Sequence, residues 1–386
     1  MEPKIRIKGF KGDWEKCIVN DIANRHDNLR IPVKESERQK GNIPYYGANG
    51  IQDYVSGYTH DGAFVLVAED GASDLEHYPV QYAEGKIWVN NHAHVLSAKE
   101  DNSTLFLKYL ISEADIKSYL VGGSRAKLNA EALMHLTIVK PFIKEQQALG
   151  TYFHHLDSLI QSTAKKIESI KQVKAASLQS MFPQEGKNMP RVRMGKRNDS
   201  WKECKLNSIL IERHEVSTIT QDLPQLSFTI AEGVIRPEDR KSNQRDFLIK
   251  DKDNKRYLIT RIGDIIYNPA NVVYGAIHRN SLMDGVVSPI YRIFSTNQDS
   301  RFIECVVRRP SFISQLAMRT EGTVTKLKTL KPEAFLDMTV SIPTDMEEQR
   351  KIGEYFKSLD TQINLQTQRL EKLKQIKSAC LDNMFV

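Results

Sequence analysis

Two long segments of the chain share one pattern of apolar and polar positions. In residues 145–182, and again in residues 348–385, apolar side chains recur at spacings of three and four. This spacing places them on one stripe of a helix, like the a and d positions of a coiled coil. Each segment predicts a helix about 57 Å long at 1.5 Å per residue. The positions predicted to pack against the other helix or a partner are Leu149, Phe153, Leu156, Ile160, Ile352, Phe356, Leu359 and Ile363.

The two segments are copies of one another. At a constant shift of 203, 16 of the 38 positions are identical, whereas average composition gives roughly two or three by chance. The start of each half also matches, with Trp14 opposite Trp201 at a shift of 187. A looser match places residues 123–128 opposite 322–327. The residues between these edges mostly differ, so we expect equivalent structural roles at the edges and different targets in the middles.

Shorter apolar runs in each middle predict strands and one helix. Glycine and asparagine separate these runs, which favours a twisted, irregular sheet in two mixed α/β domains. Strands are predicted at 64–68, 87–89, 257–261, 264–267 and 290–294, and helices at 103–120 and 301–320.

The predicted fold is α+β, with two mixed α/β domains joined by the two long helices. Two such seams in one chain pair most simply with each other, as an antiparallel coiled coil with a pseudo-twofold repeat. A dimerisation stalk between chains is the alternative. The basic segment 183–199 is interpreted as a solvated linker, with contact to phosphate as the second reading. The predicted boundaries are 1–144 and 200–346 for the domains, 145–182 and 347–386 for the helices, and 183–199 for the linker.

The overall charge is compatible with a polyanionic partner but does not establish one. Lys plus Arg number 55 against 48 Asp plus Glu, which gives a net charge of +7. The four cysteines stand far apart, which argues against a zinc ribbon or a disulfide framework and favours a cytoplasmic protein. The longest apolar run is about six residues, whereas a membrane helix needs about 20, so no membrane span is expected.

Several predicted loops have the composition of a nucleic-acid surface. Residues 43–50 combine tyrosine, asparagine and glycine, and an asparagine amide can pair with an adenine edge. Cations at the domain edges are placed to contact phosphate. For any one residue, a turn or a solvated face is an equally good interpretation. The candidate DNA contacts are Tyr45, Tyr46, Asn49, Asn91, His92, Arg125, Lys127 and Asn129 in the first half, and Arg236, Arg240, Lys241, Asn271, Tyr274, His278, Arg279, Lys326 and Lys328 in the second.

Two possible catalytic signals are weak. His92 and His94 form an H-x-H pair that can bind metal, but the second half holds no matching ligands, which favours structural or DNA-facing histidines. Residues 267–270 are similar to the Asn-Pro-Pro-aromatic motif of adenine methyltransferases but lack the second proline and the aromatic residue. No glycine-rich strand-to-helix turn, Walker loop or paired-acid nuclease motif is present. We therefore expect no catalytic centre, metal or cofactor in this chain.

The ordered motifs together resemble the specificity subunits of type I restriction-modification systems. The likeness covers essentially the whole chain. It is carried by Trp14 and Trp201, IPYYGANG at 43–50, AEDGAS at 68–73, WVNNHAHVL at 88–96, GSRAKLN at 123–129, the Tyr267-Asn268-Pro269 segment, residues 287–291 and the two proline-to-Glu-Gln helix starts.

The resemblance implies a function for each part. The two domains are expected to be target recognition domains, each reading one half of an asymmetric, split site in double-stranded DNA. The helices would set the spacer and dock two modification subunits, which use S-adenosylmethionine to methylate adenine. Restriction subunits, which use ATP and Mg, would join through that complex. The alternatives are a self-contained DNA methyltransferase or nuclease, and a coiled-coil scaffold without a DNA role. The sequence does not reveal the target bases or the spacer length.

Overall fold

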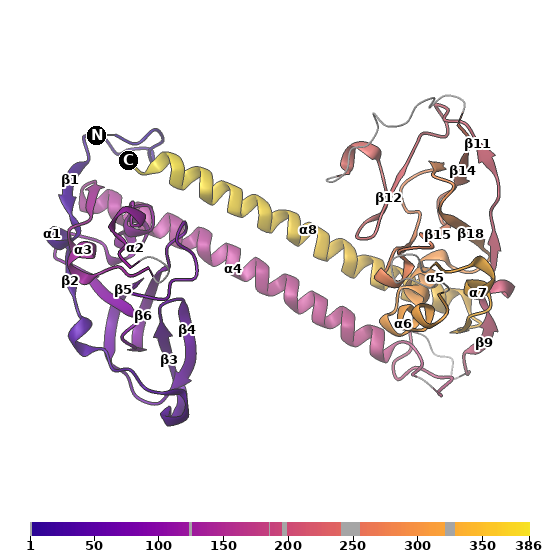
Figure 1. Cartoon of the computed structure of the whole chain (residues 1–386), viewed down its shortest axis with the longest axis horizontal. Helices are drawn as coiled ribbons and strands as arrows, with labels where there is room; N and C mark the ends of the chain where they lie inside the picture. The colour runs from indigo at the N-terminus through magenta and orange to yellow at the C-terminus, as the bar shows by residue number, and fades with distance from the viewer. Residues whose placement is uncertain (1, 123–125, 185, 195–198, 241–254, 321–328) are drawn as a thin grey trace. The chain divides into compact units, whose positions relative to one another are not determined.

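The chain forms two compact units, each built from segments far apart in the sequence. The computed structural model describes residues 2–122, 126–184, 186–194, 199–240, 255–320 and 329–386. Unit 1 comprises residues 1–165 and 366–386, and unit 2 comprises residues 166–365 (Figure 1). The long helices α4 (Ile143–Ser180) and α8 (Met346–Met384) are each shared between the units. The predicted helices are confirmed to within a few residues, but they are parts of both units rather than separate rods.

Unit 1 contains a six-stranded sheet in the order β2-β7-β5-β6-β3-β4. Its central strand, β5, is buried along most of its length because helix α2 (Thr104–Ser112) packs on it. Strands β3 and β6 are parallel, and the other neighbours are antiparallel. The strands are β2 (Ala23–Arg25), β3 (Lys40–Gly47), β4 (Gly50–Val55), β5 (His60–Ala68), β6 (Val80–Val89) and β7 (Ala93–Ala98).

Outside this sheet, short elements of unit 1 lie between the sheet and the start of α4. Strands β1 (Glu15–Ile18) and β8 (Thr137–Lys140) pair antiparallel. The short helices α1 (Val19–Ile22) and α3 (Ala130–Met134) pack next to them.

Unit 2 repeats the same strand order with different side chains. Its four-stranded sheet runs β10-β18-β15-β16, which corresponds to β2-β7-β5-β6, and its β9–β19 pair corresponds to β1–β8. The divergent middles therefore share one sheet topology. These strands are β9 (Lys202–Lys205), β10 (Leu210–Glu212), β15 (Ile265–Tyr267), β16 (Ile277–Arg279), β18 (Arg292–Thr296) and β19 (Thr339–Ile342).

The described part of unit 2 also holds two smaller sheets and the helices α5, α6 and α7. The sheets run β11-β14-β17 and β12-β13. Their strands are β11 (Val216–Ser217), β12 (Ser227–Thr229), β13 (Gly233–Ile235), β14 (Tyr257–Thr260) and β17 (Gly285–Val287); the helices are α5 (Ser300–Val307), α6 (Pro310–Met318) and α7 (Pro332–Leu336).

Equivalent hydrogen bonds correct one part of the predicted repeat. The amide of Leu128 donates to Glu69 O, and the amide of Leu330 donates to Pro269 O. Both leucines are buried and stand two residues before α3 and α7. Leu128 therefore corresponds to Leu330, a shift of 202, whereas the predicted match of 123–128 with 322–327 used a shift of 199. By this register Lys127 corresponds to Thr329, not to Lys326.

Three predicted segments need correction. The segment 43–50, interpreted as a loop, forms most of β3 and the turn into β4. The helix predicted at 301–320 is two helices, because Pro310 starts α6 and the preceding Arg309 is extended. The helix predicted at 103–120 is shorter, since α2 ends at Ser112. The predicted strands overlap β5, β6, β14, β15 and β18, although β18 begins at Arg292 and not at 290.

The chain segment before each domain is anchored by a buried ion pair. The Arg6 guanidinium donates to both oxygens of Glu145 at 2.8 and 2.7 Å. Arg193 makes the same paired contact with Glu348, at 3.0 and 2.5 Å. Both glutamates are buried, and their hydrogen bonds raise the pKa of each arginine. The prediction of a freely solvated linker at 183–199 is therefore wrong at Arg193, which fixes the linker to the start of α8.

In each unit, the phenylalanine just after one long helix packs against aromatic residues of the core. It follows α8 in unit 1 and α4 in unit 2. In unit 1, Phe385 stacks on Phe106 with ring centroids 5.7 Å apart and meets Trp14 edge-on. In unit 2, Phe182 stacks on Phe302 at 5.8 Å and meets Trp201 edge-on. The duplicated tryptophans and helix ends thus form the same aromatic cluster twice.

The predicted apolar stripe of each long helix is buried at its start and half-buried further along, and its start packs on the domain and not on the other long helix. Leu149, Phe153 and Leu156 belong to the core of unit 1, where Phe153 packs on Tyr109 of α2. Ile352, Phe356 and Leu359 lie in the core of unit 2 in the same way. Ile160 and Ile363 are half-buried. The first turns of each stripe therefore fasten the helix to its own domain.

Within each unit the two helices run antiparallel. In unit 1, Lys377 contacts Asp157 at 2.5 Å and Tyr152 lies 3.4 Å from Cys380. In unit 2, Lys174 pairs with Asp360, and Ser177 lies 2.9 Å from Tyr355. The contacting positions are the same in both units once the shift of 203 is applied.

Candidate nucleic-acid interface

Several predicted DNA contacts of unit 1 lie in loops at one end of the strands of its sheet. This loop edge consists of residues 48–50, 69–73, 90–92 and 126–129, which follow or precede the ends of β3, β5, β6 and β7 and the start of α3. Asn91 and Asn129 are exposed there. The amide group of Asn49 donates to Gly71 O and accepts from Ser73 N–H, both at 2.8 Å. Asn49 thus holds two loops together.

The charged residues of the loop edge are paired. His92 Nδ1 lies 2.5 Å from Asp70 Oδ1, and Lys127 Nζ lies 2.9 Å from Glu69 Oε1. Glu69 also accepts from Arg30 at 2.7 Å. Burial alone would raise the pKa of Glu69, but the hydrogen bonds from Lys127 and Arg30 and nearby charges hold it below its usual value. The His92 and Lys127 side chains keep about two-fifths of their surface exposed, so both can reach an external phosphate or base.

The H-x-H pair does not form a joint ligand set. His92 lies in the turn before β7, whereas His94 is buried within β7 and contacts Asp27 and Leu128 O. Across the described residues, no group of three or more His, Cys, Asp or Glu side chains is placed to hold a metal ion.

Tyr45 and Tyr46 are interior residues, which corrects their prediction as DNA contacts. They lie on β3 opposite Trp88 and Val89 of β6. Tyr45 is only 1% exposed, and its hydroxyl accepts from Val33 N–H at 3.0 Å. Their ring surface is therefore used in the fold of unit 1.

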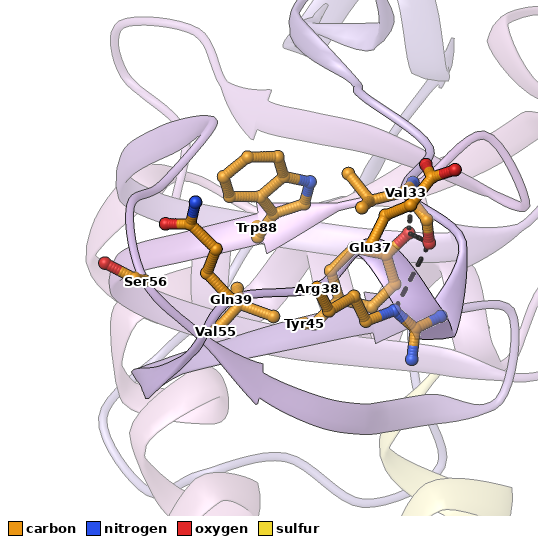
Figure 2. Close-up of a pocket in the computed structure, with 8 residues that line it drawn as sticks. All are labelled: Val33, Glu37, Arg38, Gln39, Tyr45, Val55, Ser56 and Trp88. Carbon is orange, nitrogen blue, oxygen red and sulfur yellow. Dashed lines mark hydrogen bonds between the residues drawn. The ribbon is translucent and has the colours of Figure 1, made fainter.

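A concave surface adjoins the loop edge and includes residues that the sequence did not single out. Figure 2 shows its first part, a cavity of about 270 Å³ in which Arg38 lies over the Tyr45 ring, 4.2 Å from the centroid. Trp88 forms another wall and donates from Nε1 to Ile31 O at 2.7 Å. A neighbouring cavity of about 400 Å³ shares Arg38 and Tyr45 and extends to Asn91 and His92. Trp88 stood in the WVNNHAHVL motif, but nothing in the sequence indicated Arg38.

The predicted contacts of unit 2 divide into exposed and buried groups. Tyr274 is 66% exposed, and the Arg236 side chain is 56% exposed. Asn271 and Arg240 are half-buried. Arg279 is half-buried too, and its Nε donates to Ser300 Oγ at 2.7 Å. Arg125, Lys241, Lys326 and Lys328 lie outside the described residues.

His278 is a core residue of unit 2, which corrects its prediction as a DNA contact. The ring is buried, and Nε2 lies 2.7 Å from Ile230 O. Burial lowers the pKa of His278 to about 4, so the ring is neutral at physiological pH and donates to that carbonyl. Gly233 passes so close that a Cβ there would lie 2.7 Å from the His278 ring.

Comparison with known proteins identifies the family. The model of the type I restriction modification DNA specificity domain matches residues 11–172 and again residues 198–375. The chain belongs to this family. It carries two copies of the specificity domain, and the two copies coincide with the repeated strand order of units 1 and 2.

Named relatives of the specificity subunit family agree with this assignment. A putative type I restriction enzyme specificity subunit of Haemophilus influenzae, S.HindORF215P, is 43% identical over 153 residues, which cover 40% of this chain and 39% of that protein. The MjaVIII specificity subunit of Methanocaldococcus jannaschii is 20% identical over 404 residues, which cover 96% and 91% of the two chains. The stronger similarity to the Haemophilus protein thus spans about two-fifths of its length.

A solved structure shares the fold. The type I restriction-modification S subunit from M. genitalium matches with a TM-score of 0.70 over 100% of this chain and 99% of that chain, at 13% identity. This likeness supports the architecture of two mixed α/β domains with long helices. No helix among the described residues is both long and apolar enough to cross a membrane.

Proposed function

We propose that this chain is the non-catalytic specificity subunit of a type I restriction-modification complex. Each unit reads one half of a split, asymmetric site in double-stranded DNA. The observation that carries this proposal is one strand order presented twice with different side chains at the surface. Unit 1 offers Asn91, His92 and Lys127 at its loop edge, whereas unit 2 offers Tyr274 and Arg236. Two domains with the same strand order but different exposed side chains can read two different half-sites.

The exposed face of the long helices supports docking of two copies of one partner. Nine positions within 151–166 are exposed in both helices, and none of them is identical between the copies. Eight positions within 168–179 are exposed in both, and four are identical. Folding gives no reason for identity at solvent-facing positions, but a shared external partner does. The identical pairs, here called the outer ridge, are Glu168/Glu371, Lys171/Lys374, Gln172/Gln375 and Ala176/Ala379.

The catalytic step belongs, in this proposal, to the partner that docks on the outer ridge. Two modification subunits would each dock on one copy, supply S-adenosylmethionine and methylate adenine. Restriction subunits would bring ATP and Mg through the same complex. The antiparallel pairing seen inside each unit supports a pseudo-twofold coiled coil, whose length sets the spacer between the half-sites.

A methyl-transfer assay tests whether recognition and catalysis reside in different subunits. The purified chain, the modification subunit and their mixture are incubated separately with DNA and labelled S-adenosylmethionine. Site-specific transfer is expected only in the mixture, and transfer by the chain alone would show a self-contained methyltransferase. A salt-sensitive gel shift that persists with the mixture excludes a mere scaffold.

Matched variants of the helix surface locate the docking site. Ala176→Arg combined with Ala379→Arg places a long charged side chain on the outer ridge, so co-purification of the partner should be lost. Ser158→Arg combined with Thr361→Arg changes exposed positions that differ between the copies, so partner binding should persist. Equal loss in both variants would argue against the ridge.

A further inference from the structure

Strands β3 and β4 form a two-stranded ribbon at one side of the unit 1 sheet (Figure 1). β4 is the last strand in the sheet order, so its outer edge has no partner strand in the described part of the chain. The ribbon turns at Ala48 and Asn49, which belong to the loop edge. A two-stranded β-ribbon is one of the protein elements that fit into the major groove of B-DNA. The exposed side chains of β4 are therefore candidates for contact with base edges.

A β-bulge in this ribbon redirects the side chain of Gln52. Tyr46 pairs with Ile51 and Tyr45 pairs with Asp53, so Gln52 is an extra residue of β4 with no partner in the ladder. Bulges of this kind re-aim a side chain and are common beside functional sites. The bulged residue is exposed and lines the cavity of about 400 Å³ that reaches the loop edge.

The hydrogen bonds of Asn90 determine which atom of the Gln52 amide group faces it. Asn90 is buried, and its Oδ1 accepts from His92 N–H at 2.8 Å. Its Nδ2 therefore faces Gln52 and donates to Oε1 of that residue at 3.4 Å. Oε1 keeps one lone pair and Nε2 keeps both hydrogens. Within the described part of the chain no further hydrogen bond uses them.

Gly47 leaves open the space that the Gln52 amide group occupies. A Cβ at position 47 would lie 2.3 Å from Gln52 Nε2 and 2.6 Å from the amide carbon. The three heavy atoms nearest to that position all belong to the Gln52 amide group. They are the far end of a flexible side chain, so an alanine at position 47 would displace the amide group and leave the backbone in place.

The groups of Gln52 that remain available match one base in the major groove. Adenine presents the N7 acceptor beside the N6 amino donor, and a glutamine amide pairs with both, since Nε2 donates to N7 and Oε1 accepts from N6. Guanine presents two acceptors, N7 and O6, and would place an oxygen opposite Oε1. Lys34 lines the same cavity with a side chain that is 82% exposed, so it is placed to contact a backbone phosphate beside that base.

We propose that Gln52 is a specificity-determining residue of unit 1, and that the β3–β4 ribbon places its amide group on the edge of one adenine in the major groove. The inference rests on the proposed function of the two units. The hairpin of β12 and β13 in unit 2 has a regular ladder without such a bulge. The requirement for this adenine should therefore belong to one half-site alone.

The first test maps adenine methylation in cells that carry the modification subunit and each variant of the chain. With the unchanged chain, one half-site should hold a fixed A·T pair that is not itself methylated. Gln52→Leu keeps the size of the side chain but removes both polar groups, so that pair alone should become unspecified. Gln52→Glu can only accept, which suits the N4 amino group of cytosine, so the preference should move from adenine to cytosine.

Binding by the purified complex with its modification subunits measures the size of the effect. Four duplexes differ only at the pair that Gln52→Leu relaxes. The unchanged complex should prefer the adenine duplex by about tenfold or more, the scale of one paired amide contact with adenine. The Gln52→Leu complex should bind all four nearly alike, and the Gln52→Glu complex should bind the cytosine duplex best.

A further variant separates the position of the amide group from its presence. Gly47→Ala keeps Gln52 but fills the space of its amide group, so it should relax the same pair as Gln52→Leu. Gln39→Leu is the matched control. Gln39 lies at the other end of the ribbon (Figure 2), where its carbonyl oxygen accepts from Ser56 N–H at 2.8 Å. Loss of its amide group should leave the methylated motif unchanged.

The outcomes distinguish the inference from the proposed function. Absence of site-specific methylation by the unchanged complex contradicts the proposed function. A split motif that stays the same in both Gln52→Leu and Gln52→Glu overturns the role of Gln52 alone. Equal loss of binding to all four duplexes in both variants also overturns it, because Gln52 would then support the fold and not read a base.

Discussion

Removing one heptad from each long helix is expected to shorten the spacer of the DNA site and leave both half-sites unchanged. The deletions are residues 161–167 and 364–370, which are equivalent in the repeat and preserve the a/d stripe. Seven residues correspond to about 10 Å of helix, or about three base pairs at 3.4 Å each. The anchoring contacts in each unit, including Asp157–Lys377 and Lys174–Asp360, lie outside the deletions. Glu168 and Glu371 of the outer ridge are also kept.

The readout is the adenine methylation pattern in cells that carry the deleted chain and its modification subunit. Deleting residues 161–167 alone is the control, because it puts the two seams out of step and should abolish methylation. Altered half-site bases, or an unchanged spacer with full methylation, would show that the helices do not set the distance.

Phe182→Ala is expected to destabilise unit 2 by about 3–5 kcal/mol, the cost of truncating a buried phenylalanine. Phe182 is 1% exposed and contacts Trp201, Phe302 and Phe356. Arg309 also lies over its ring, 4.8 Å from the centroid, so the cavity opens beside a half-buried cation. Hydrogen exchange should rise across unit 2 and stay low in β5 and α2 of unit 1, and methylation of the intact site should fall with it.

The matched control for this prediction lies on helix α4, which ends two residues before Phe182. Val173→Ala removes an apolar side chain that is 46% exposed, so exchange in unit 2 should stay within the range of the unchanged chain. Wild-type exchange in Phe182→Ala would mean that the end of α4 is not part of unit 2. Uniform exchange throughout both units would mean that they unfold together.

The long helices and the frame of each domain could be predicted because their signals are local or repeated. A 38-residue stripe with one period specifies a helix without knowledge of its partner. The Trp14/Trp201 match located the start of each domain. The equivalence of the Arg6–Glu145 and Arg193–Glu348 pairs could also have been predicted. Residues 3–6 match residues 190–193 at the same shift of 187, which aligns the two arginines.

The side chains at the surface could be predicted only in part, because exposure depends on contacts distant in the sequence. Tyr45 and His278 are residue types that often contact DNA. In the fold, however, Tyr45 lies beside β6 and His278 lies against the chain at Ile230. His94 contacts Asp27 and the carbonyl oxygen of Leu128, and the spacing of these residues carries no motif. Arg38 lines the concave surface because the loop that precedes β3 folds over Tyr45.

The most direct test of the two-domain reader is a long-read map of adenine methylation in the host. Strains with the chain intact and with its gene deleted are compared. The account predicts one methylated motif made of two different short half-sites separated by unspecified bases, and its complete loss in the deletion strain. A contiguous or palindromic motif that depends on the chain, or methylation that persists without it, would contradict the account.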